Sequence, residues 1–282
     1  MTAFAASQPV RAMPVKVMGV LNVTPDSFSD GGRFAAPEAA LAQARRLIAE
    51  GADILDVGGE STRPGAEPVD AAAEIDRVVP LIRAIRAESA VPISVDTMKP
   101  AVARAAAAAG ATIWNDVTAL RQAPDSLAVA AELGCEVVLM HMQGEPGTMQ
   151  AEPRYDDVVG EVAAFLAARA EAAMAAGVAR DRIWLDPGVG FGKHRTRHNL
   201  PLLAGLDRIV ALGFPVLLGV SRKSFIGALD DGAEADRRLG GSIAGALAGA
   251  AAGVAAVRVH DVRETVQALR VWRAIAQAGS LG

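Results

Sequence analysis

Residues 17–32, VMGVLNVTPDSFSDGG, begin as a valine-rich apolar run and become polar after Val23. The first seven residues are typical of a strand that is buried on both faces of a parallel sheet. The proline, serine, aspartate and glycine residues that follow are typical of a loop. An amphipathic segment over residues 37–51 comes next and ends in glycine, as helices often do. The stretch therefore predicts a strand, a polar loop and a helix in that order.

The same order recurs along the chain. Further buried strands are predicted at residues 52–59, 91–96, 111–116, 135–141, 182–188, 214–221 and 255–261. Amphipathic or alanine-rich segments such as residues 71–88 and 156–177 lie between them. Eight strand–helix units predict an α/β fold, a (β/α)8 TIM barrel. An open doubly wound sheet is the alternative, but it would carry a glycine-rich phosphate loop after its first strand. Since no linker is visible, we predict a tail over residues 1–14 and one barrel domain over residues 15–282.

The composition excludes several classes of protein. A net charge of −4 and an aromatic content of 4% argue against a nucleic-acid-binding surface. The single cysteine, Cys135, cannot form an internal disulfide, and its place in an apolar run predicts a core position in a reducing compartment. The N-terminus lacks the features of a signal peptide, and no apolar run reaches the ~20 residues of a membrane span. We therefore expect a cytoplasmic protein.

Every predicted strand ends in polar or charged residues. In chain order these include Asn22, Asp56, Asp96, Asn115, Asp116, His141, Asp186, Ser221, Arg222, Lys223, Arg258 and His260. In a barrel such residues converge on one mouth, where the chemistry of the fold takes place. Capping of the next helix explains single Asp, Asn or Ser residues, and it is our interpretation of Asp116 and Asp261. It does not explain lysine, arginine and histidine at the same positions.

The strand-end residues fall into two chemical groups. The first offers acceptors, an amide and one cation, which suits the donor-rich edge of a flat heterocycle such as a guanine-like or pterin ring. It comprises Asp96, Asn115, Asp186 and Lys223. The second suits an anion such as an oligophosphate. It comprises Asn22, Arg63, Arg258 and His260.

Eight motifs then carry a family resemblance. They are MGVLNVTPDSFSDGG, ADILDVGGESTRPGA, PISVDTMKP, WNDV, VLMHMQGEPGTMQ, LDPGVGFGK, GVSRKSFIG and RVHDV. Together they resemble the dihydropteroate synthase family, in order and over nearly the whole chain. The resemblance implies a TIM barrel that joins 6-hydroxymethyl-7,8-dihydropterin pyrophosphate to p-aminobenzoate with Mg²⁺. The products are 7,8-dihydropteroate and pyrophosphate. It also implies a homodimer in the folate pathway and sulfonamides as inhibitors.

The resemblance also implies roles for single residues. The pterin contacts are Thr62, Asp96, Asn115, Val117, Met140, Asp186 and Lys223. The pyrophosphate contacts are Asn22, Arg63, Arg258 and His260, of which Asn22 also binds Mg²⁺. The p-aminobenzoate contacts are Phe28, Arg63, Pro64, Phe191, Ser221 and Ser224. The catalytic residues are Asp96, Lys223, Arg258 and His260.

Two loops are expected to act as lids. The glycine- and proline-containing segments after the first two strands are long enough to close over the second substrate and exclude water. Phe28 would then form a wall of the p-aminobenzoate slot. Packing of Phe28 into the barrel rim is the alternative.

The orientation of a glycine ridge and the choice between three related functions stay open in the sequence. The glycines at positions 241, 245, 249 and 253 form a ridge that faces either the barrel or a second subunit. Two functions compete with the synthase. One is a pterin-binding methyltransferase with a corrinoid partner, which would not need the GGESTRPGA, SRKS and RVHD motifs. The other is a non-catalytic pterin-binding paralogue.

Overall fold

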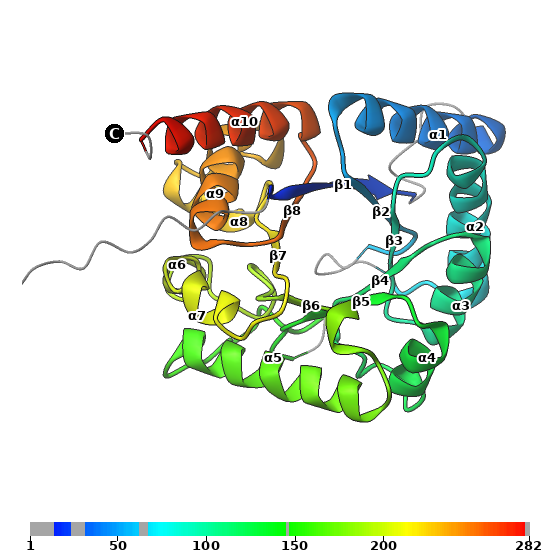
Figure 1. Cartoon of the computed structure of the whole chain (residues 1–282), viewed down its shortest axis with the longest axis horizontal. Coiled ribbons are helices and arrows are strands. Elements are labelled where there is room, and N and C mark those ends of the chain that lie inside the picture. The colour runs from blue at the N-terminus through cyan, green and yellow to red at the C-terminus, as the bar shows by residue number, and fades with distance from the viewer. Residues whose placement is uncertain (1–13, 24–31, 62–66, 145–146, 280–282) are drawn as a thin grey trace, which may run out of the picture.

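The computed structural model describes residues 14–23, 32–61, 67–144 and 147–279 of the chain. Eight strands lie in one sheet in the order β6-β5-β4-β3-β2-β1-β8-β7, and every neighbouring pair is parallel. The strands are β1 (Lys16–Asn22), β2 (Ile54–Gly58), β3 (Ile93–Asp96), β4 (Ile113–Asp116), β5 (Glu136–Met140), β6 (Ile183–Asp186), β7 (Leu217–Gly219) and β8 (Ala256–Val259). A parallel bridge between Leu185 and Val216 joins the two ends of this order. The sheet is therefore closed, and the predicted TIM barrel is confirmed (Figure 1).

Helices surround the barrel (Figure 1). They are α1 (Gly32–Glu50), α2 (Ala71–Glu88), α3 (Pro100–Ala109), α4 (Ser126–Leu133), α5 (Val158–Ala175), α6 (Asn199–Ala204), α7 (Leu206–Val210), α8 (Ser224–Leu229), α9 (Leu239–Ala252) and α10 (Val262–Gly279). Asp70 and Asp157 cap α2 and α5, because each side chain accepts a bond from a backbone N–H in the first turn. Over the described residues, none of the helices has the length and apolar character that a membrane crossing requires.

The buried side chains form two main layers. The larger layer lies between the sheet and the surrounding helices and includes Cys135, which is 8% exposed, as predicted for a core residue. A separate cluster takes one side chain from each of seven strands. Its members are Met18, Ile54, Ile113, Val138, Trp184, Leu217 and Ala256. Because this cluster is separate from the sheet–helix layer, we assign it to the interior of the barrel, where it forms an apolar plug.

The glycine ridge of α9 faces the barrel. A Cβ atom added at Gly249 would lie 2.4 Å from Leu218 Cδ2, and one added at Gly245 would lie 3.0 Å from Val220 Cγ2. Leu218 belongs to β7, and Val220 follows it. The helix therefore approaches β7 more closely than any larger residue would allow, which decides between the two orientations of the ridge.

Candidate active site

The position of the polar site follows from the alternation of side chains along each strand. Successive side chains of a strand point to opposite faces, so a residue two positions beyond the plug points to the same side as the plug. In five of the seven strands those positions hold Asp56, Asn115, Met140, Asp186 and Arg258, and in β1 and β7 they hold Val20 and Gly219. On β3, the buried Ser94 leads in the same way to Asp96. The apolar plug thus forms the floor of a site whose polar side chains come from the carboxyl ends of the strands.

Arg258 lies at the centre of this site. Its Nε donates a 2.6 Å hydrogen bond to Asp56 Oδ2, and its Nη2 donates one of 2.8 Å to Asp96 Oδ2. Asn115 Nδ2 lies 3.3 Å from Asp56 Oδ2. One guanidinium therefore links β8 to β2 and β3, which lie at the other end of the chain. Asp56 is fully buried, and it is a site residue for which its place at a predicted strand end indicates no role.

The protonation of Asp96 reflects two opposing influences. Burial disfavours its charged form and raises its pKa to about 7, while Arg258 acts in the opposite direction. Burial also lowers the pKa of Arg258, but the two facing carboxylates outweigh it and raise that pKa. Arg258 therefore stays charged, and Asp96 titrates close to neutral pH.

A second polar group lies beside an apolar surface. Asp186 Oδ1 accepts a 2.7 Å bond from Gly188 N, and burial raises the pKa of Asp186. Lys223 Nζ lies 4.1 Å from the centre of the Phe191 ring, and burial followed by the charge of Arg258 lowers the pKa of Lys223 to about 8. Two further predicted pterin contacts belong to a methionine-rich cluster. The buried members of that cluster are Val117, Met140, Met142 and Met149, with Met98 and Phe191 packed against them.

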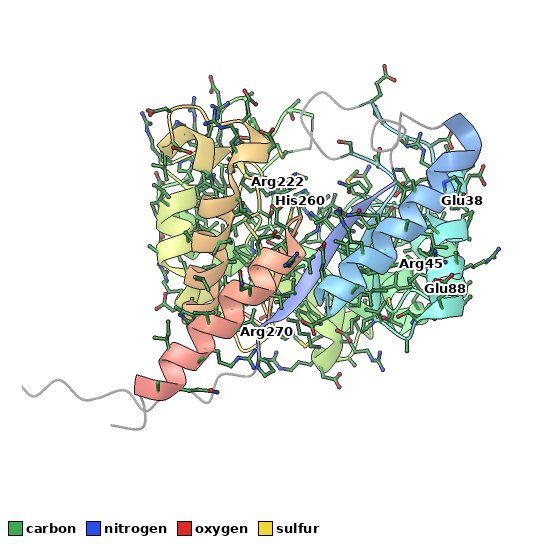
Figure 2. The ribbon with its side chains drawn as sticks, turned by 90° about the horizontal axis from the view of Figure 1, so that it is seen from above. Glu38, Arg45, Glu88, Arg222, His260 and Arg270 are labelled. Carbon is green, nitrogen blue, oxygen red and sulfur yellow. The ribbon has the colours of Figure 1, made fainter. Side chains whose placement is uncertain are left out.

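The loops after β7 and β8 are joined by two contacts. Ser221 Oγ lies 3.0 Å from His260 Nδ1 and also accepts a 3.2 Å bond from His260 N. Arg222 binds both carboxylate oxygens of Asp261 at 3.1 and 2.5 Å. Figure 2 shows Arg222 and His260 close together near the start of α10. Burial and then Arg258 lower the pKa of His260 to about 4, so its imidazole is neutral at pH 7.

Asn22 lies beside Asp96 across a glycine. The strand register pairs Asn22 with Gly58 and Gly58 with Asp96. A Cβ atom at Gly58 would lie 3.4 Å from Asn22 Oδ1 and 3.8 Å from Asp96 Oδ2, so the glycine leaves space between the two side chains. Within the described ranges, no three His, Cys, Asp or Glu side chains gather as metal ligands would.

The remaining predicted residues divide into two groups. Ser224 is exposed at the first position of α8. Phe28, Thr62, Arg63 and Pro64 lie outside the described residues, so their proposed contacts stay predictions. The structure adds Lys193, whose buried side chain binds His141 and the loop that carries Phe191. Only a weak sequence signal marks this lysine, since GVGFGK lacks the spacing of a phosphate-binding loop.

Comparison with known proteins points to one group. The family model described as pterin binding enzyme matches residues 18–260. A dihydropteroate synthase from Streptococcus pyogenes is 50% identical over 256 residues, which cover 90% of this chain and 93% of that protein. A solved structure of the Xanthomonas albilineans dihydropteroate synthase with 4-aminobenzoic acid has a TM-score of 0.87 and 52% identity, with 93% of each chain covered. The same enzyme in complex with 7,8-dihydropteroate has a TM-score of 0.84 and 49% identity, again with 93% of each chain covered.

Proposed function

The chain belongs to the dihydropteroate synthase family of pterin-binding enzymes, and from this we propose how its own residues perform the reaction. It is a transferase that condenses 6-hydroxymethyl-7,8-dihydropterin pyrophosphate with p-aminobenzoate, and it releases 7,8-dihydropteroate and pyrophosphate. The observation that carries the mechanism is the position of Arg258 between Asp56 and Asp96. The corrinoid methyltransferase and the non-catalytic paralogue are set aside, because the relatives compared are synthases over nearly their full length.

The pterin would bind with its polar edge toward the carboxylates. A pterin presents a row of N–H donors, and Asp186, Asn115 and Asp96 offer acceptors at the carboxyl ends of β6, β4 and β3. Met140 and Val117 belong to the apolar cluster beside them, which suits the face of a flat ring. Lys223 supplies a cation at the same place.

The departure of pyrophosphate would separate charge within this site. The bond between the pterin methylene carbon and the pyrophosphate oxygen breaks, and its electron pair leaves with the pyrophosphate. The carbon that remains carries positive charge, which the carboxylate of Asp96 would stabilise. At ~4 Å and an effective dielectric constant near 20, one such pair is worth about 4 kcal/mol before screening. Arg258 and His260 would bind the departing anion.

The attack by p-aminobenzoate then completes the reaction. Its aniline nitrogen is a neutral base at pH 7, forms the new carbon–nitrogen bond and then releases a proton to solvent, so it needs mainly positioning. Phe191, Ser221 and Ser224 would form the slot for it. Phe28, Arg63 and Pro64 would complete the slot from the two loops that lie outside the described residues.

We propose that Mg²⁺ binds in the space beside Gly58. Mg²⁺ prefers oxygen ligands, and the amide oxygen of Asn22 borders this space together with a carboxylate oxygen of Asp96. We therefore expect Asn22 to hold the ion. When bound, it would neutralise charge on the leaving pyrophosphate.

Three further properties are part of the proposal. The protein would be cytoplasmic and homodimeric, and sulfonamides would inhibit it because they carry the same aniline ring as p-aminobenzoate. Light scattering tests the dimer, and a shift of the p-aminobenzoate KM by a sulfonamide tests the inhibition.

The order of bond breaking has a direct test. Pyrophosphate release is measured with Mg²⁺ and the pterin pyrophosphate, with and without p-aminobenzoate. Slow release without the amine supports a cation that forms before attack. No release in its absence, together with full turnover in its presence, would favour concerted displacement.

A further inference from the structure

Lys193 is a buried lysine to which the reaction assigns no role. Its residue is 1% exposed and is among the largest fully buried side chains of the described chain. Among the residues that the structure describes, no carboxylate oxygen lies within 4.0 Å of its Nζ. Lysine is rarely buried to this extent without such a partner, because the charge loses its hydration. A buried lysine with only neutral partners therefore calls for an explanation.

The surroundings of Lys193 match an ammonium group. Its Nζ lies 2.9 Å from His141 Nδ1, 2.9 Å from the Gly188 carbonyl oxygen and 3.0 Å from that of Phe191. An ammonium has three N–H donors, and these three acceptors can take one each. Burial, followed by the charge of Lys193, lowers the pKa of His141 to about 3, so the ring is neutral and its Nδ1 accepts the bond. Burial also lowers the pKa of Lys193 to about 7, while the more distant charge of Asp186 favours the ammonium form.

Lys193 binds carbonyl oxygens of the same loop to which it belongs. The segment from Gly188 to Lys193 follows β6, and Phe191 N donates a 3.0 Å bond to Gly188 O. Lys193 therefore holds both ends of the turn that carries Phe191, and it attaches this turn to His141, which directly follows β5. The carbonyl oxygen of Gly192 is held separately by a 2.8 Å bond from the Tyr155 hydroxyl.

Two glycines in this loop mean that contacts from side chains must restrict its conformation. Gly188 has φ +65°, and a Cβ atom there would lie 1.9 Å from His141 O. Gly192 has φ +57°, and a Cβ atom there would lie 2.3 Å from Gln143 O. Glycine is required at both positions, but it also gives the chain more conformations to lose on folding. The rigidity of the loop must therefore come from the side chains of other residues, and Lys193 is placed to supply it.

We propose that Lys193 is a positioning residue that fixes Phe191 as a wall of the p-aminobenzoate slot. Its bond to the Phe191 carbonyl oxygen fixes the orientation of that peptide group, and the peptide group fixes the position of the Phe191 ring. The centre of this ring lies 4.1 Å from Lys223 Nζ. The inference rests on the proposed function, because Phe191 borders p-aminobenzoate only if the enzyme uses that substrate. Lys193 is buried and binds the loop that carries Phe191, so its loss should raise the KM for p-aminobenzoate more than the KM for the pterin pyrophosphate.

The test is Lys193→Met, which keeps the length and apolar stem of the side chain and removes the three donors. We expect the KM for p-aminobenzoate to rise tenfold or more, while the KM for the pterin pyrophosphate stays within threefold. The matched control is Arg86→Met. Arg86 also binds backbone carbonyls, those of Ser89 and Gly110, but at the amino-terminal end of the barrel. This control should lower the unfolding temperature and leave both KM values unchanged.

A rise of both KM values by the same factor, or an unchanged p-aminobenzoate KM, would overturn the proposal. If Lys193→Met does not fold, Tyr155→Phe gives the second test, because it releases Gly192 O without leaving a charge. Its p-aminobenzoate KM should rise two- to fivefold at constant pterin KM, and no change would count against the proposal. A wild-type enzyme that forms no dihydropteroate would instead reject the proposed function, so the two failures are distinguishable.

Discussion

Arg258 Nη2 donates a 2.8 Å hydrogen bond to Oδ2 of Asp96, and this bond joins β8 to β3 across the mouth of the barrel. Both residues also have a proposed role in the reaction, and the substrate groups that they stabilise have opposite charges. Arg258 is proposed to bind the leaving pyrophosphate, and Asp96 is proposed to stabilise the cation that remains. Without substrate, Arg258 is paired with both Asp96 and Asp56. Substrate must therefore redistribute an ion pair that already exists.

Asp96→Asn should lower turnover by roughly two to three orders of magnitude. The change keeps the size of the side chain but removes the charge that opposes the developing cation, and each ~1.4 kcal/mol lost slows the reaction tenfold. Steady-state measurement of dihydropteroate formation tests this. A loss smaller than about threefold would remove Asp96 from the proposed role.

The activity should fall as the pH drops below about 7. The pKa of Asp96 is raised to about 7, so a proton neutralises the carboxylate just below neutral pH. Because kcat/KM reports groups of the free enzyme, its pH profile should show this ionisation. The residual activity of Asp96→Asn should lack it, and a variant with the same acidic limb would assign the ionisation to another group.

The raised pKa of Asp96 also affects stability, and the sign is opposite to that of a salt-bridged carboxylate with a lowered pKa. The folded pKa of about 7 exceeds the ordinary value of 3.8, so the folded protein holds more protons between these values. The contribution of Asp96 to the unfolding free energy is therefore greatest below about pH 4 and is lost as the pH rises through about 7. Urea unfolding across this range should show the loss in the wild type and not in Asp96→Asn. Identical pH profiles for the two proteins would assign the effect elsewhere.

Arg258→Met should destabilise the protein by roughly 3–5 kcal/mol at neutral pH. The variant leaves the buried carboxylates of Asp56 and Asp96 without a counter-charge. Urea unfolding measures the loss, and adding Asp56→Asn to the variant should recover part of it. The control is Arg45→Met, which breaks the exposed pair with Glu88 on the outer face of α1 and α2 (Figure 2). Equal losses in the two single variants would contradict the role of Arg258 as a buried counter-charge.

Gly249→Leu should destabilise the fold, while Gly240→Leu should not. Leucine at 249 would overlap Leu218 of β7, and overpacking of this kind costs about 1–3 kcal/mol or more. A Cβ atom at Gly240 meets nothing within 4 Å, although both glycines belong to α9. Thermal unfolding and light scattering distinguish the outcomes. A variant at 249 that unfolds normally but changes the oligomeric state would place the ridge at a subunit interface.

The barrel was predictable because the local signals of the sequence agree. The apolar runs, the amphipathic segments and the glycine ends repeat in one order, and the glycine that ends the first predicted helix, Gly51, has φ +101°. Residues 71–88 were predicted as a helix and form α2. Strands were predicted too long, as residues 214–221 show against β7 at Leu217–Gly219. Apolar residues continue past the last ladder bond, because burial extends beyond the paired backbone.

The site was predictable as a set of positions but not as a set of contacts. Parallel strands bring their carboxyl ends together, which is why Asp96, Asn115 and Arg258 converge. The pairing of Arg258 with Asp56 joins residues that are 202 positions apart, and no periodicity reveals such a bond. Lys193 was equally hidden, because two of its three close partners are backbone carbonyls, which every sequence offers. The structure was needed to identify its role.

Product formation by the purified protein is the decisive measurement. The pterin pyrophosphate, Mg²⁺ and p-aminobenzoate are incubated with the enzyme, and dihydropteroate is followed by chromatography, with Asp96→Asn in parallel. We predict dihydropteroate and pyrophosphate in equal amounts from the wild type, and a rate lower by roughly two to three orders of magnitude from the variant. Tight pterin binding by the wild type without any product would contradict the synthase reaction.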